Sequence, residues 1–472
     1  MKRVQMKNKV YAALLTLLIL PLGWAESVIE IPNNAVNQRI LKELDLDHDC
    51  MGNNRDSLHF LLDEDAQEKL SKRKFFKTQL FKHSTTAVEN VLSQFDQFPL
   101  DQDLGIYHTF EEMEAELQVT AESHPSLVTL TVGAISHEGR PIYVLDITGS
   151  GCGTDKVNFL ITGTHHAREW ISTEVPLAFI EHLVAGYGND ELITNLLDTS
   201  HIVIVPMLNP DGGVYSRTQE RMWRKNRRKP EGQYSTGIDN NRNYPYQWGG
   251  SGSSSWGGSQ TYRGPEPTSE IETQLVISLQ EQYGFKTAVS FHSYSELVLW
   301  PWGYTSSIQA ADHDIFALYG NEMGEIMDYQ PMQASNLYPA AGIFDDTLYA
   351  TYGVLAYTIE LGTQFVPHEQ QVPIIEQKSI NALRYLFTTA RDPFGGNQNT
   401  PVRKTMRFLE QLVYHIENHK QSQETAPVYD KLMNFDEDLR LQAMDKLKMH
   451  PAMREKINDG ISYHLRYKKL HQ

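Results

Sequence analysis

The chain has 472 residues, of which 40% are hydrophobic and 10% aromatic, so it is long enough and apolar enough to bury a sizeable core. Its formal net charge of −17 argues against nucleic acid or an anionic membrane surface as a partner, because both are polyanions that would repel it. We expect a globular protein for which cationic partners are easier to accommodate.

Residues 1–25 are predicted to be an export signal. Basic residues precede an apolar run over residues 10–22, and Gly23 and Ala25 offer small side chains for cleavage. An uncleaved anchor is the alternative, but the run is shorter than the roughly 20 residues that span a bilayer. We therefore expect a secreted or periplasmic mature protein that begins near Glu26 and has no stable membrane anchor after cleavage.

Residues 26–102 are predicted to form a small α/β unit followed by a linker. Apolar runs at residues 28–31 and 58–62 are typical of strands, and a helical pattern follows each of them. A basic cluster at residues 72–74 precedes a polar segment with the composition of an accessible linker. The two cysteines are Cys50 and Cys152, and nothing in the sequence shows whether they pair.

Residues 103–395 are predicted to form the main α/β domain. Apolar β runs alternate with amphipathic helices, as at residues 172–185 and 374–389, which indicates a sheet with helices on both faces. The candidate strands cover residues 127–132, 142–147, 157–161, 202–205, 287–291 and 354–359. Residues 396–472 form a tail rich in charged residues and helix formers, which we expect to be helical or partly disordered and whose role is unknown.

Polar clusters follow three of the apolar β runs. His166, His292 and Glu360 each end such a run, and Glu169 lies three residues after His166, close enough to share one helical turn. Because open α/β sheets bind ligands at the carboxyl ends of their strands, these side chains are expected to converge in one crevice. Catalytic zinc sites use three N or O ligands of this kind and leave one position open for water. An isolated His-x-x-Glu pair is more commonly a solvated surface feature, and other divalent ions bind the same ligand set.

The order and separation of these motifs resemble the zinc metallocarboxypeptidase family, in the branch that contains pancreatic carboxypeptidases A and B and their bacterial relatives. The resemblance covers residues 105–393 and includes GTHHAREW, SFHSY and TIEL. It implies an α/β fold with a mixed eight-stranded sheet and helices on both faces, preceded by a small α/β pro-segment and followed by the tail. It also implies one Zn²⁺ ion bound by His166, Glu169 and His292, with His165 as a non-ligand neighbour.

The resemblance assigns two residues to the reaction itself. Hydrolysis of an amide at neutral pH needs an activated water, a base for its proton and a cation beside the oxyanion. Glu360 matches the general base of the family, and Arg224, in the basic segment ERMWRKNRR, matches its electrophilic arginine. Without the resemblance, Glu360 would be interpreted as a carboxylate that caps a strand end, and the basic segment as a solvated loop.

The segment IDNNRNY matches the part of the family that binds the terminal carboxylate of the substrate. That role falls on Asn241 and Arg242, and a planar guanidinium offers two parallel hydrogen bonds matched to a carboxylate. Asp239 falls on the position that accepts a hydrogen bond from the first zinc histidine and fixes its tautomer.

Other substrate contacts are assigned in the same way. Tyr338, in NLYPAAG, resembles the mobile tyrosine that closes over substrate, and Arg168 and Phe365 fall on or near further pocket positions. Ungapped alignment from Tyr338 places Asp345 at the base of the side-chain pocket, where carboxypeptidase B has an aspartate that favours Lys or Arg. The residues around Asp345 depart from the family pattern, and Asp346 is the alternative inward carboxylate.

The predicted function is zinc-dependent release of single residues from the carboxyl termini of peptides or proteins, with a preference for Lys or Arg. Two other classes stay open: a zinc amidohydrolase acting on cell-wall peptides or acylated amino acids, and an inactive zinc-containing peptide-binding module. Residues 26–102 resemble the activation segment of pancreatic procarboxypeptidases in placement, which predicts a zymogen and an activating protease as a partner. A permanently attached accessory domain is the alternative.

Overall fold

The computed structural model describes residues 27–32, 50–54, 57–62, 104–151, 156–229 and 237–394, and in the tail 405, 406, 408–410, 412, 413, 416 and 422–471. The predicted signal, the helical patterns and linker of residues 33–102, and Cys152 lie outside these residues. Within them, no helix is long and apolar enough to cross a membrane.

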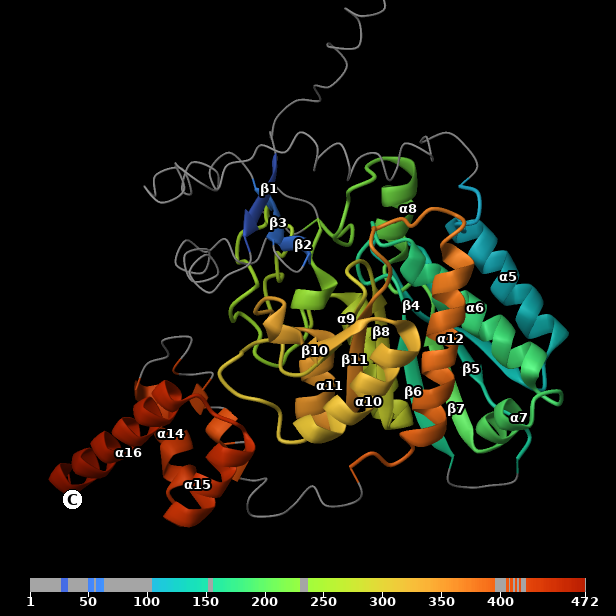
Figure 1. Ribbon diagram of the computed structural model, residues 1–472. Coiled ribbons are helices and arrows are strands. Elements are labelled where there is room, and N and C mark those ends of the chain that lie inside the picture. Colours follow the sequence, from blue (N-terminus) through green and yellow to red (C-terminus); the bar gives the residue numbers. More distant parts are fainter. Residues whose placement is uncertain are drawn as a thin grey trace, which may run out of the picture.

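A mixed eight-stranded sheet runs through the main domain, as expected, in the order β10-β9-β11-β8-β6-β7-β5-β4 (Figure 1). The central strands β11, β8, β6 and β7 are parallel to one another, and β5 and β4 continue the sheet in antiparallel fashion. On the other side, β9 is antiparallel to β11 and parallel to β10. The strands are Val128–Ile135 (β4), Pro141–Ile147 (β5), Val157–Thr162 (β6), Ser200–Val205 (β7), Thr287–His292 (β8), Leu297–Trp300 (β9), Gln330–Gln333 (β10) and Leu355–Glu360 (β11).

Helices cover both faces of this sheet because successive strand residues point to opposite sides. On β6, Phe159 and Ile161 join a hydrophobic cluster with α6 and α12, which pack against each other, whereas Leu160 joins a second cluster with α9 and α11 (Figure 1). The predicted helices at residues 172–185 and 374–389 are confirmed as α6 and α12. The helices are Phe110–Ser123 (α5), Ile171–Gly186 (α6), Glu191–Asp198 (α7), Pro210–Thr218 (α8), Ile271–Tyr283 (α9), His313–Met327 (α10), Phe344–Tyr352 (α11) and Val372–Thr389 (α12).

Smaller elements precede and follow the main domain. The strands β1 (Ser27–Pro32), β2 (Cys50–Asn54) and β3 (Ser57–Leu62) form an antiparallel sheet in the order β1-β3-β2, in which β1 and β3 contain the two apolar runs predicted as strands. In the tail, α14 (Ser422–Leu432), α15 (Glu437–Lys446) and α16 (Pro451–His471) are helical. The backbone N–H of Gln309 donates to the carbonyl of Leu447 at 2.9 Å, so the tail contacts the loop before α10.

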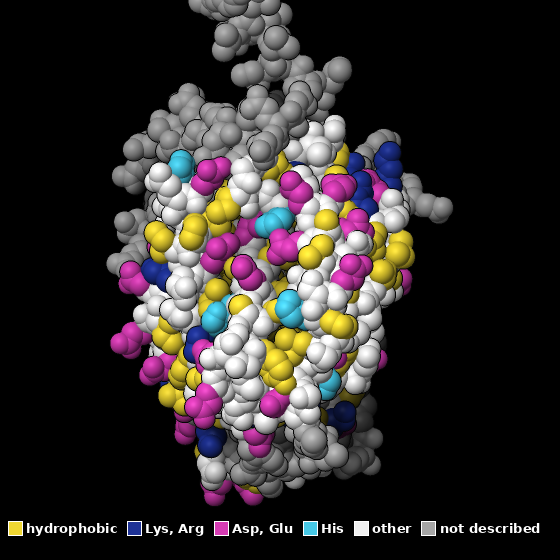
Figure 2. Space-filling model, turned by 90° about the vertical axis from the view of Figure 1, so that its right-hand side faces the viewer, with side chains coloured by type: hydrophobic (Ala, Val, Ile, Leu, Met, Phe, Trp, Pro, Cys, Tyr) yellow, Lys and Arg dark blue, Asp and Glu magenta, His cyan; other side chains and the backbone are white. Residues whose placement is uncertain are grey.

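The surface reflects the acidic composition. On the side of the molecule where α5 and α6 lie, acidic side chains outnumber basic ones (Figure 2). One acidic pair on these helices holds His108, at the start of the domain. Nδ1 of His108 lies 2.5 Å from Oε2 of Glu174 on α6, and its Nε2 lies 2.9 Å from Oε2 of Glu116 on α5. Hydrogen bonds to Glu116 and Glu174 raise the pKa of His108 to about 10.

We predict that His108→Gln lowers the free energy of unfolding at pH 7, and that the difference from the wild type shrinks as the pH rises to 10. A group whose pKa is raised in the folded state stabilises fully below its unfolded pKa of about 6.5, and this contribution is lost as the pH rises through the folded pKa. Urea unfolding of both proteins across this range measures the difference. The exposed His124→Gln is the matched control, and a His108→Gln deficit that is constant between pH 7 and 10 would contradict the prediction.

Candidate active site

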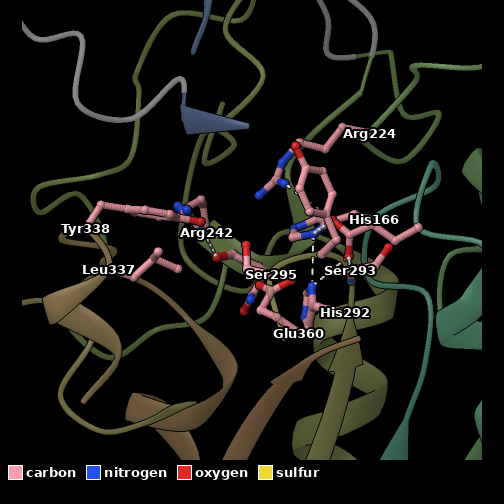
Figure 3. Close-up of a pocket in the computed structure, with 12 residues that line it drawn as sticks. His166, Arg224, Arg242, His292, Ser293, Ser295, Leu337, Tyr338 and Glu360 are labelled. Atoms are coloured by element: carbon pink, nitrogen blue, oxygen red, sulfur yellow. Dashed lines mark hydrogen bonds and ion pairs between the residues drawn. The ribbon is translucent and has the colours of Figure 1, made fainter. Parts of the chain in front are cut away.

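A polar pocket opens at the carboxyl edge of the sheet (Figure 3). The register of the strands explains its position, because Glu360 at the end of β11 lies opposite His292 at the end of β8. The adjacent strand β6 ends at Thr162 and leads directly into the turn that carries His166 and Glu169. The residues that line the pocket are His166, Glu169, Arg224, Asn241, Arg242, His292, Ser293, Tyr294, Ser295, Leu337, Tyr338 and Glu360.

His166 and Glu169 lie on a non-helical turn, so their expected placement on a helical turn is wrong. The backbone N–H of Glu169 donates to the carbonyl of His166 at 3.3 Å, and α6 begins only at Ile171. A Cβ atom on Gly163 would overlap the carbonyl oxygens of Ser172 and Pro206. This close approach of backbones confines the chain to a tight turn before the helix begins, and the turn directs both side chains into the pocket.

Three buried side chains bring possible metal ligands together. Nδ1 of His166 lies 2.8 Å from Oε1 of Glu169, and Nδ1 of His292 lies 3.0 Å from Nδ1 of His166 and 2.9 Å from Oε2 of Glu169. Ligand atoms of a tetrahedral zinc ion lie about 3.4 Å apart when each bond is about 2.1 Å long. Burial lowers the pKa of His292, which favours the neutral imidazole that a metal requires. The set therefore fits a zinc ion in chemistry, and its ligand atoms are close enough together for one ion to contact all three residues.

The buried carboxylate of Asp239 orients both the metal site and the nearby arginine. Its Oδ1 lies 3.1 Å from Nε2 of His166, and its Oδ2 accepts hydrogen bonds from Nε and Nη2 of Arg224 at 3.1 and 3.0 Å. The contact with Nε2 leaves the lone pair of Nδ1 on His166 for a metal. Burial would raise the pKa of Asp239, but Arg224 and His166 outweigh it and hold this pKa well below its usual range.

Glu360 lies at the pocket wall beside the metal ligands. Desolvation and the negative charge of Glu169 raise the pKa of Glu360 well above its usual range, whereas the positive charge of Arg224 opposes this shift. A carboxylate with a raised pKa is a better proton acceptor, so Glu360 is a candidate base for a reaction in this pocket.

Asn241 and Arg242 lie in the short 3₁₀ helix η1 (Asn240–Arg242), which begins directly after Asp239. Oδ1 of Asn241 accepts a hydrogen bond from the backbone N–H of Phe344 at 2.9 Å, so its Nδ2 is the group left to donate. Nε and Nη1 of Arg242 donate to the carbonyls of Gly252 and Asn241, both at 2.6 Å. These bonds fix the plane of the guanidinium, and Nη2 has no partner among the described residues.

Tyr338 follows the short helix η2 (Ala334–Asn336) and lines the pocket with Leu337, and its side chain extends toward Arg242 (Figure 3). The two segments are packed closely, because a Cβ atom on Gly252, which has a φ of 75°, would overlap the carbonyl oxygen of Pro339. Gly252 therefore accepts the hydrogen bond from Nε of Arg242 and also packs directly against the segment that carries Tyr338.

Arg168, predicted to contact substrate, does not line the pocket. It is buried with its guanidinium 4.5 Å from the centre of the Phe365 ring, and Phe365 in turn packs edge-to-face on Tyr294 at 4.9 Å. Desolvation lowers the pKa of Arg168 to about 10. Arg168 and Phe365 thus lie behind the pocket wall that Tyr294 forms.

Asp345 and Asp346 are both buried at the start of α11, and neither lines the pocket. Asp346 accepts hydrogen bonds from the backbone N–H groups of Gly303 and Tyr304 at 2.9 and 3.0 Å. Asp345 accepts one hydrogen bond from the hydroxyl of Thr358 at 2.9 Å, and its Oδ2 has no partner among the described residues. Desolvation raises the pKa of Asp345 well above its usual range. Of the two carboxylates, Asp345 is the one with an oxygen free to bind a ligand.

Four residues that line the pocket were not predicted from the sequence: Ser293, Tyr294, Ser295 and Leu337. Each lies within three residues of His292 or Tyr338, and this adjacency was the signal available. His165 is held away from the possible metal ligands, because its Nδ1 and Nε2 lie 3.0 and 2.8 Å from the hydroxyls of Ser290 and Tyr244.

Proteins of known sequence and structure resemble this chain across its main domain. The family model described as zinc carboxypeptidase matches residues 113–382. Carboxypeptidase A2 of Mus musculus is 34% identical over 268 residues, which are 56% of this chain and 62% of the mouse protein, so less than two thirds of that relative is covered. Carboxypeptidase B of Astacus astacus is 33% identical over 291 residues, 58% of this chain and 94% of the relative. The crystal structure of carboxypeptidase A from Helicoverpa armigera matches 79% of this chain and 100% of that chain with a TM-score of 0.64 and 22% identity, which supports the fold alone.

We predict that Asp239→Asn weakens zinc binding by about 10-fold to 100-fold, because the substitution removes the anion that orients His166. Competition with a chromogenic chelator measures the zinc dissociation constant. Asp312→Asn is the matched control, since Asp312 is also buried but bonds to Tyr349 and not to the possible metal ligands. An unchanged dissociation constant in a folded Asp239→Asn protein would contradict the prediction.

Proposed function

We propose, because this chain belongs to the zinc carboxypeptidase family, that it hydrolyses the last peptide bond of peptides or proteins and releases the carboxyl-terminal residue. His166, Glu169 and His292 would hold one catalytic zinc ion. One observation carries the proposal: a single pocket contains this possible ligand set together with a carboxylate, Glu360, and a fixed guanidinium, Arg242. The ligand set and Glu360 suit metal-assisted hydrolysis, and the guanidinium suits recognition of a chain end.

In this mechanism the protein groups move the proton and stabilise the developing charge. When bound, zinc supplies a water whose pKa is lowered toward 7 and polarises the carbonyl of the scissile bond. Glu360 accepts the proton of the attacking water on its carboxylate and then donates it to the nitrogen of the leaving amine. Arg224 is held in position by Asp239, so its guanidinium stabilises the oxyanion without reorienting.

Recognition of the free carboxyl terminus is assigned to Asn241 and Arg242. The guanidinium of Arg242 is fixed by two carbonyls, and Nδ2 of Asn241 is left to donate, so the two residues can bind a carboxylate with charge-assisted hydrogen bonds. A peptide bond inside a chain offers no such charge in this position. Tyr338, beside Arg242, would cover the bound residue and exclude water.

We propose a preference for carboxyl-terminal Lys or Arg, based on Asp345. This buried carboxylate has one oxygen without a partner among the described residues, and it lies beside Thr358, two residues before Glu360 on β11. A terminal Lys or Arg side chain that entered from the pocket would supply the missing hydrogen-bond donors and a compensating charge. Entry requires the pocket to extend toward α11 when substrate binds.

We also propose that residues 1–25 direct export to the periplasm or the medium, and that residues 26–102 are a pro-segment removed by an activating protease near residues 72–74. The composition of the first 25 residues supports the export signal. The position of residues 26–102 before the main domain and the basic cluster at residues 72–74 support the pro-segment.

Glu360→Gln is predicted to lower kcat by about 10²-fold to 10⁴-fold while the bound zinc stays at one equivalent in the catalytic site, because the variant keeps the ligands and loses the base. Single-turnover kinetics and metal analysis of the same sample measure both quantities. Glu296→Gln is the matched control, since Glu296 lies next to the lining residue Ser295 but does not line the pocket. Full activity of Glu360→Gln would contradict the mechanism, and a wild-type protein that binds peptides without cleaving them would indicate a binding module.

Asp345→Ile is predicted to lower the ratio of kcat/KM for Lys-terminated over Leu-terminated peptides by about 10-fold to 100-fold, the cost of losing a hydrogen bond between charged groups. Peptides that differ only in the last residue are compared, with a Glu-terminated peptide as a third substrate. Equal rates on the three peptides in the wild type would refute the preference while leaving the carboxypeptidase activity intact.

A further inference from the structure

A second cluster of possible metal ligands lies outside the pocket. His137 is in the turn between β4 and β5, Glu270 is the N-cap residue of α9, and Glu272 is in the first turn of that helix. None of the three lines the catalytic pocket. One ligand atom from each lies within 4.8 Å of those of the other two.

The distance between two of these residues matches that between ligands of one metal ion. Nε2 of His137 lies 3.4 Å from Oε2 of Glu270. Two ligands of one tetrahedral cation are about 3.4 Å apart when their bonds are about 2.1 Å long. One imidazole nitrogen and two carboxylates are the donors found around zinc and similar divalent transition metals, whereas calcium and magnesium prefer oxygen ligands.

Glu272 provides independent support for a ligand at this cluster. Its side chain is fully buried, and its Oε1 has no hydrogen-bond partner among the described residues. Its other oxygen, Oε2, accepts a long hydrogen bond of 3.3 Å from Nδ2 of Asn226. A buried carboxylate oxygen without a donor costs free energy unless a cation or proton binds it.

The two glutamates of the cluster carry more negative charge than the neighbouring guanidinium compensates. Glu270 is paired with Arg228, whose Nη1 lies 2.7 Å from Oε1, so a second negative charge, that of Glu272, stays uncompensated by this guanidinium. The side chain of His137 is 33% exposed, which provides a route for an ion from solvent.

We propose that His137, Glu270 and Glu272 form a second metal site, which binds one divalent transition-metal ion of the zinc class. The ion would complete the coordination of Glu272 and join the turn between β4 and β5 to the start of α9. Arg228 reduces its affinity, because a cation 2.7 Å from Glu270 repels another. The second site should therefore bind its ion more weakly than the catalytic site does.

This site would also support the catalytic residues at a distance, through Asn226. Nδ2 of Asn226 donates to Glu270 at 2.7 Å, and its Oδ1 accepts from the backbone N–H of Ile238 at 2.8 Å. Asn226 is two residues beyond Arg224, and Ile238 directly precedes Asp239. An ion that fixes Glu270 and Glu272 thus holds the two segments that bring Arg224 and Asp239 together. The role is one of positioning, since neither carboxylate touches the pocket.

The test is zinc stoichiometry of the full-length protein, without an affinity tag, at pH 8 and micromolar free Zn²⁺. The wild type should bind two equivalents, His137→Ala and Glu272→Gln one each, and His292→Ala one, through the second site. The surface variant His124→Ala should keep two. One equivalent in the wild type under these conditions, or two in His137→Ala, would overturn the proposal.

A second readout does not depend on activity or on the catalytic site. Co²⁺ added to His292→Ala should give visible absorption bands of a cobalt ion with nitrogen and oxygen ligands, and these should vanish when His137→Ala is added. Excess Zn²⁺ should raise the Tm of the wild type above that of the protein with only its tight site filled, and it should leave the Tm of His137→Ala unchanged. A cobalt spectrum that survives the removal of His137 would show that the ion binds elsewhere.

Discussion

The catalytic arrangement depends on one buried anion, the carboxylate of Asp239. It bonds to His166, to two nitrogens of Arg224 and to the backbone N–H of Asn241, all between 3.0 and 3.1 Å. A buried carboxylate is stable only with such partners, so the groups that satisfy Asp239 are held in fixed positions. These are a possible metal ligand, the arginine proposed to stabilise the oxyanion and the start of the proposed carboxylate clamp. In the proposed mechanism one charge therefore couples metal binding, transition-state stabilisation and substrate recognition.

The sheet supplies the other constraint. Parallel strands β6, β8 and β11 end at the same edge, and the register places Glu360 directly opposite His292. His166, His292 and Glu360 are far apart in the sequence, and they meet because the strands that carry or precede them end at the same edge. The possible second metal site is built differently, since it joins a β-turn to the start of a helix and is linked to Arg224 and Asp239 through Asn226.

Much of this was predictable from the sequence, because strand-end polar residues after apolar runs are a local pattern. Local sequence patterns predicted the helices α6 and α12 and the convergence of His166, His292 and Glu360 with Glu169, whereas the mixed eight-stranded sheet was expected only from the family resemblance. The non-helical turn at His166 was not, because it results from backbone packing around Gly163. The position of Arg168 behind the pocket wall and the backbone partners of Asp346 were not predictable either. Both depend on how a loop and α11 pack against the sheet. The cluster at His137 was not predictable, because His137 lies 133 residues before Glu270 and no spacing rule links it to the two glutamates.

In the proposed function, the protein hydrolyses the peptide bond next to a free carboxyl terminus and requires zinc to do so. The most direct measurement compares two peptides of identical sequence, one with a free terminal carboxylate and one with a terminal amide, digested by the zinc-loaded protein and followed by mass spectrometry. We expect the free peptide to lose residues one at a time from its end, the amidated peptide to stay intact, and both to stay intact once zinc is removed by a chelator. Equal cleavage of the two peptides, or cuts within the chain, would contradict the assignment of Asn241 and Arg242 as a carboxylate clamp and with it the exopeptidase function.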